Sequence, residues 1–93
     1  MKVFGSIIGF YSYEITKNNQ NHTVYCYMVI CGDFDEKTKL FRSGSLARCK
    51  CIDKYPFQPN FGDKVLMEQK TFINENREQI NYYTNIELLE VVL

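Results

Sequence analysis

Apolar and polar residues alternate along much of this chain, which is typical of strands that bury one face. The clearest case is Arg42 to Ile52, where every second residue from Arg42 to Lys50 reads Arg, Gly, Leu, Arg, Lys. The opposite face carries small or apolar residues, namely Ser43, Ser45, Ala47, Cys49 and Cys51. The alternation predicts a half-buried antiparallel strand with a cationic outer face that meets an anionic partner.

Two strands are expected before this one. In Lys2 to Ile15, Gly5 and Gly9 would let a long strand bend sharply, and many aromatic residues disfavour a helix. The polar run Lys17 to Asn21 predicts a hairpin loop, and His22 to Cys31 predicts the second strand. We expect the second strand to bury Val24, Cys26, Met28 and Ile30 and to point Thr23, Tyr25, Tyr27 and Val29 outward.

The charged run at residues 32–39 predicts a turn into the third strand. After it, the segment 53–63 contains Pro56 and Pro59 and cannot be a regular interior strand. It predicts an ordered connection that packs Tyr55, Phe57 and Phe61 into the core. Two more strands follow, Lys64 to Ile73 and Ile80 to Val92, joined by a hairpin tip from Asn74 to Gln79.

Composition supports one small β domain and changes the picture of its charge. The 93 residues include seven Tyr, seven Phe and no Trp, a bias that favours strands. The formal net charge is zero, which by itself disfavours a nucleic-acid binder. The charge is unevenly distributed, however, because Lys37 to Lys54 holds six basic residues against the single acid Asp53. Such asymmetry allows a basic surface on a neutral protein.

The four cysteines are Cys26, Cys31, Cys49 and Cys51. Their C-x4-C and C-x-C spacings differ from the C-x-x-C pairs of most zinc sites, so buried reduced thiols are the favoured interpretation. The amino-terminal run does not have the pattern of a signal peptide, and no run approaches the ~20 apolar residues that span a bilayer. We therefore expect a cytoplasmic protein that has no membrane association.

Catalytic chemistry has little basis in this sequence. His22 is the only histidine, so it is the one residue around which a catalytic Cys-His or Ser-His pair could be built. The acids Asp33, Asp35 and Glu36 lack the spacing of a calcium-binding loop. We expect a protein without enzymatic activity, catalytic residues, metal or cofactor.

The order of the expected elements resembles a small OB-fold barrel, with a glycine-bent first strand, a hairpin, a longer connection and a closing hairpin. The segment PNFGDKVLMEQKTF resembles the entry to the fourth strand of many OB-fold proteins, where a Gly-Asp turn precedes a β-branched residue. In size and layout, most of the chain is similar to the single-stranded DNA-binding proteins of filamentous phages, the gene V protein type. The expected fold is an all-β, five-stranded OB-like barrel over residues 1–93, with an ordered connection between strands three and four.

This resemblance implies a homodimer that coats single-stranded DNA during replication or recombination of a phage or other mobile element. Binding would combine a cationic groove with aromatic stacking, which contributes about 1–3 kcal/mol per base and tolerates any sequence. A protein partner from a replication complex is also expected. The residues that could serve are Tyr25 and Tyr27 on strand two, Arg42, Arg48 and Lys50 on strand three, and Tyr11 and Tyr13 on strand one.

Three alternatives stay open at this point. The tyrosines could instead pack at a barrel edge or a subunit interface, and the cations could form an ordinary solvated face. The same barrel could then be a protein-interaction module or an accessory subunit. A third hypothesis is a zinc-stabilised domain that uses the four cysteines.

Overall fold

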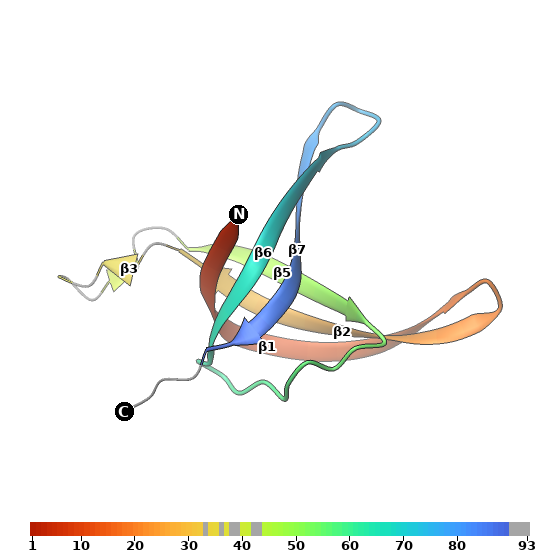
Figure 1. Cartoon of the computed structure of the whole chain (residues 1–93), viewed down its shortest axis with the longest axis horizontal. Helices are drawn as coiled ribbons and strands as arrows, with labels where there is room; N and C mark the ends of the chain where they lie inside the picture. Colours follow the sequence, from red (N-terminus) through yellow and green to blue (C-terminus); the bar gives the residue numbers. More distant parts are fainter. Residues whose placement is uncertain (33, 36, 38–39, 42–43, 90–93) are drawn as a thin grey trace.

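Every regular element in the described part of the chain is a β-strand. The computed structural model describes residues 1–32, 34, 35, 37, 40, 41 and 44–89 (Figure 1). The strands are β1 (Lys2–Lys17), β2 (Gln20–Cys31), β3 (Phe34–Asp35), β4 (Leu40–Phe41), β5 (Ser45–Ile52), β6 (Lys64–Ile73) and β7 (Gln79–Leu88). No membrane-crossing helix occurs among the described residues.

Five of the strands form a closed barrel in the order β1-β2-β5-β7-β6, with the pair β3-β4 forming a separate ladder. The all-β, five-stranded barrel expected from the sequence is therefore confirmed, and its layout is compatible with an OB-like fold. The connection at residues 53–63 contains no helix and links β5 to β6 across one side of the barrel (Figure 1). The charged segment after β2 holds the short β3-β4 ladder and is more than the simple turn that we expected.

The barrel needs a glycine where β1 crosses β2. A Cβ atom on Gly5 would lie 2.7 Å from the carbonyl oxygen of Ile30 and would also collide with the Val29 side chain. One extra residue in β1, between Ile7 and Gly9, then shifts the register with β2 and forms a bulge. The prediction that glycines shape the first strand is consistent with both features.

Two hairpins extend beyond the barrel in different directions (Figure 1). The first, which we call the β1–β2 arm (residues 14–23), ends in a tight turn where Asn18 and Asn19 have φ angles of 53° and 62°. The second, the β6–β7 arm (residues 70–82), remains paired out to Ile73 and Gln79. The radius of gyration is 15.0 Å, larger than the roughly 12 Å of a compact domain of this length, as two projecting arms require.

The core lies inside the barrel and is apolar. Its buried members are Ile7, Tyr27, Val29, Cys31, Ala47, Cys49, Val65, Met67 and Ile86. The prediction for the third barrel strand is confirmed, since Ala47 and Cys49 are buried and Arg48 and Lys50 are exposed. In β6, Val65 and Met67 are fully buried. Among the described residues, no polar or charged residue is buried.

The prediction for the second strand is only partly confirmed: Val24 and Cys26 are buried as expected, but the face that points into the barrel is the other one. Tyr27 and Val29 are fully buried, whereas Met28 and Ile30 are only partly buried on the opposite face. The cause is register: Tyr27 pairs with the inward-facing Cys49, and paired residues in antiparallel strands point to the same side of the sheet. Both faces of this strand are apolar, so alternation alone could not decide which one is inside.

Two other expectations require correction. Phe57 packs against the core as predicted, but Phe61 is 85% exposed and Tyr55 lies at the surface. In the last strand, simple alternation predicts one shared side for Ile80, Tyr82, Thr84, Ile86 and Leu88. A bulge with φ of 55° at Asn85 interrupts this alternation, so Tyr83 and Ile86 both contact the core. That strand ends at Leu88, and the remaining predicted residues, 90–92, lie outside the described part of the chain.

Candidate nucleic-acid interface

Tyrosines and cations meet on the outside of β1, β2 and β5. Residues paired across these three antiparallel strands share one face, because cross-strand partners point to the same side of a sheet. The rows are Gly9–Met28–Arg48, Tyr11–Cys26–Lys50 and Tyr13–Val24–Ile52. We call these nine residues the outer face. A column of tyrosines on β1 thus lies two strands, about 10 Å, from a column of cations on β5.

Tyr11 and Tyr13 form a stacked pair on this face. Their ring centroids are 5.9 Å apart with an interplanar angle of 23°, and the side chains are 41% and 37% exposed. The paired residues on β2, Cys26 and Val24, are buried. The two rings are therefore supported by the sheet while part of their surface is open to a ligand.

The charge of Arg48 influences the pKa of Tyr11, one member of the tyrosine pair. The pKa of the Tyr11 phenol is raised, chiefly by its hydrogen bond with the Cys26 thiol and then by desolvation, while the nearby charge of Arg48 acts in the opposite direction. Within the described residues, neither Arg48 nor Lys50 takes part in a salt bridge. Both cations are thus available to an anionic ligand beside the tyrosines.

A surface depression of about 460 Å³ lies next to these cations, between β5 and β7. Its lining includes Arg48, Lys50, Asn81, Tyr82 and Thr84. Tyr82 is a candidate that sequence reasoning missed: its side chain is 42% exposed and its ring lies 5.7 Å from that of Phe72. No local sequence pattern places Tyr82 beside Arg48 and Lys50, because β5 and β7 are distant in sequence and meet only through barrel closure.

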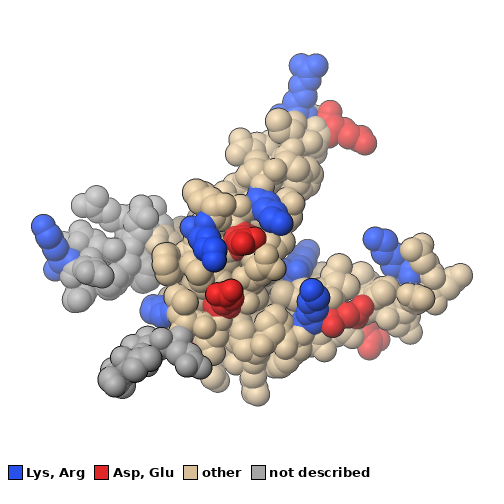
Figure 2. All heavy atoms as spheres, in the orientation of Figure 1, with Lys and Arg blue, Asp and Glu red and all other residues tan. Residues whose placement is uncertain are grey.

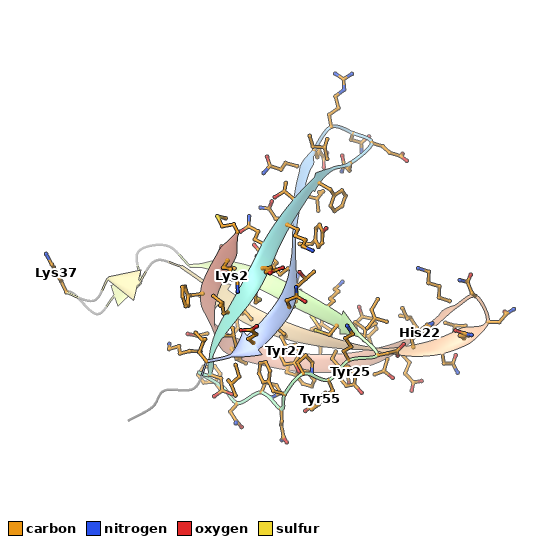
Figure 3. All side chains as sticks on the ribbon, in the orientation of Figure 1. Lys2, His22, Tyr25, Tyr27, Lys37 and Tyr55 are labelled. Carbon is orange, nitrogen blue, oxygen red and sulfur yellow. The ribbon has the colours of Figure 1, made fainter. Side chains whose placement is uncertain are left out.

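Tyr25 and Tyr27 do not belong to the outer face. Figure 3 shows both rings gathered with Tyr55 where the connection crosses the barrel. Tyr25 lies 4.9 Å from Tyr55, and Tyr27 lies 5.0 Å from Phe10, measured between ring centroids. Burial raises the pKa of the Tyr27 phenol, whose hydroxyl donates a 2.6 Å hydrogen bond to the Phe57 carbonyl. Its predicted outward orientation is wrong, because that ring is fully buried. Arg42 lies outside the described residues.

One polar junction fixes the base of the β1–β2 arm. The Asp53 carboxylate accepts a hydrogen bond from the Thr23 backbone N–H (2.9 Å) and contacts His22 Nδ1 (2.5 Å). The Asp53 N–H in turn donates to the Thr23 carbonyl at 2.7 Å. Figure 3 places His22 where the arm leaves the barrel. This junction joins the residue that follows β5 to the base of the arm.

The cysteines are free thiols, and three of them, Cys26, Cys31 and Cys49, are buried. Burial raises the pKa of the Cys49 thiol to about 12. No group of three or more metal-ligating residues occurs in the described part of the chain. The cysteines that the structure describes therefore lack the clustering that a zinc site requires.

Charge is mixed over the face of the molecule shown in Figure 2, where basic and acidic side chains alternate. Mixed charge limits the phosphate contacts that this face of the molecule offers. This agrees with the zero net charge of the chain.

The class defined by this geometry is a closed, five-stranded β-barrel that carries exposed tyrosines and exposed cations on one face. Searches against protein-family models, curated proteins and solved structures found no match.

Proposed function

We propose that this protein binds single-stranded DNA with little sequence preference through the outer face. The observation that carries the proposal is the exposed Tyr11–Tyr13 pair on the same face as the unpaired cations Arg48 and Lys50. Bases would stack on the rings while phosphates contact the cations, as in other proteins that bind single strands.

The proposal extends to assembly and biological role. A homodimer is supported by the β6–β7 arm, a two-stranded ribbon on which Phe72 and Ile73 are exposed. A second copy of the chain would stabilise this ribbon by covering its apolar side chains. A role in replication or recombination of a phage or mobile element rests on the resemblance in chain layout to the gene V type. A protein partner from the replication complex belongs to the same proposal.

The test is fluorescence anisotropy of a labelled 30-nucleotide poly-dT strand, titrated with the protein at two salt concentrations, beside a duplex of equal length. Binding that prefers the single strand and weakens as salt rises is expected. Equal binding to strand and duplex, or no binding at low salt, would contradict the proposal.

A second function is favoured by one further observation. Leu46 and Ile52 are 48% and 55% exposed on β5, on the same side as Arg48 and Lys50. Exposed apolar side chains on either side of the two cations suit a protein partner, and the barrel would then be an interaction module or accessory subunit. Salt separates the two functions, because two phosphate contacts should weaken DNA binding about 7-fold between 50 and 200 mM salt, whereas an apolar protein interface need not weaken over that range.

A further inference from the structure

The depression between β5 and β7 exists because these two strands barely pair. They run parallel and share a single residue pair, Cys49 with Tyr83, at which the barrel closes. Around this pair, about 460 Å³ of open space is lined by residues 46–48 and Lys50 of β5 and by residues 81–84 of β7. That volume is within the range of sites that hold small ligands.

One residue in the lining has a hydroxyl group without a hydrogen-bond partner in the described part of the chain. The Thr84 hydroxyl oxygen is buried and has no hydrogen-bond partner among the described residues. Leaving a buried hydroxyl unpaired destabilises the folded protein, and such groups are rare in native structures. A ligand that enters the depression and displaces the side chains covering this oxygen would supply the missing hydrogen bond.

The other lining groups indicate which chemical class would fit. Tyr82 offers a ring supported by Phe72, and Arg48 and Lys50 offer positive charge. The Asn81 side-chain oxygen accepts a 2.9 Å hydrogen bond from the Thr71 hydroxyl, which leaves the Asn81 amide hydrogens available as donors. A flat ring, hydrogen-bonding groups and two cations around one small space match the face of a base, the edge of a base and the phosphate of a nucleotide.

We infer that the depression is a single-nucleotide subsite, in which one base stacks on Tyr82 and hydrogen-bonds to Thr84 while its phosphate contacts Arg48 and Lys50. The inference rests on the proposed function and deepens it. One nucleotide of the bound strand is held by its base edge, and the others are held by stacking and charge alone.

The test is the substitution Thr84→Val, which keeps the β-branched shape and removes the hydroxyl. Since the unpaired hydroxyl destabilises the free protein, the variant is expected to melt about 4 °C or more above the parent. Its affinity for the poly-dT strand is expected to fall about 2- to 10-fold, the value of one hydrogen bond. Thr84→Ser, which retains the hydroxyl, should bind poly-dT within about 2-fold of the parent.

Two controls make the outcome specific. Thr16→Val removes a hydroxyl that is exposed and already bonded to Asn21 on the β1–β2 arm, so it should cause neither the stabilisation nor the loss of affinity. A 30-unit abasic strand should bind the parent and Thr84→Val equally, because it has no base to contact position 84.

The outcomes distinguish the inference from the function on which it rests. If the parent binds poly-dT and Thr84→Val binds it equally well, the nucleotide subsite is wrong and the proposed function stands. If affinity falls equally for poly-dT and for the abasic strand, the hydroxyl has no role in base binding and the inference is overturned. If the parent binds no single strand, the proposed function fails, and the subsite with it.

Discussion

Removing Arg48 or Lys50 should change how binding depends on salt, because these cations are the charged part of the outer face. For single strands, each neutralised phosphate adds about 0.7 to the slope of log affinity against log salt concentration. The change from 50 to 200 mM salt should therefore weaken binding about 2.6-fold per contact. Arg48→Ala and Lys50→Ala should each flatten the slope by about 0.7, whereas Tyr11→Ala should lower affinity about 5- to 150-fold with an unchanged slope.

The assay is anisotropy of the labelled poly-dT strand at four salt concentrations between 50 and 200 mM, with each variant checked for unaltered thermal unfolding. Lys2→Ala is the matched control, since Lys2 is exposed near the start of β1, away from the tyrosine pair. Its slope should equal that of the parent. The reasoning is refuted if all three outer-face variants stay folded and bind like the parent, or if Lys2→Ala flattens the slope as much as Arg48→Ala.

Three further predictions concern stability. Tyr27→Phe removes the hydrogen bond to the Phe57 carbonyl and should lower the free energy of unfolding by about 1 kcal/mol in urea titrations, and an unchanged midpoint would contradict this. Above pH 9 the unfolded chain releases a Cys49 proton that the folded protein retains, so stability should fall by about 1.4 kcal/mol by pH 10. Cys49→Ala should reduce that alkaline loss. The hydrogen bond with His22 lowers the pKa of Asp53. The stability that the ionised Asp53 adds to the folded protein should therefore be present at neutral pH and disappear as pH falls below about 4. Asp53→Asn should make acid unfolding less steep, which circular dichroism against pH would measure.

The strands and their order could be predicted because local signals agreed. Two asparagines at the first hairpin tip, prolines in the connection and strict alternation in β5 each identified an element without tertiary information. The inward side of β5 was also readable, since Ala47 and Cys49 alternate with Arg48 and Lys50. Charge on one face settles the orientation of a strand in a way that apolar residues cannot.

The inward side of β2 could not be read locally. Val24 and Cys26 are buried beside the tyrosine pair, and Tyr27 and Val29 are buried in the barrel, so this strand has apolar residues on both faces. Its orientation follows only from pairing with β5, through partners such as Tyr27 and Cys49. For the same reason Tyr82 was missed, because its proximity to Arg48 depends on closure of the barrel by one parallel pair.

Placement of the aromatic residues reconciles a neutral chain with the nucleic-acid ligand that we propose. With Tyr27 in the core, the exposed rings on the side of the cations come from β1 and β7, on either side of Arg48 and Lys50. Two phosphate contacts per chain correspond to a salt slope near 1.4, far weaker than that of a strongly basic binder. Two or three stacked bases would contribute several kcal/mol, which salt hardly affects. A protein built in this way has no need of excess positive charge, and its affinity should persist at salt concentrations that release a purely electrostatic binder.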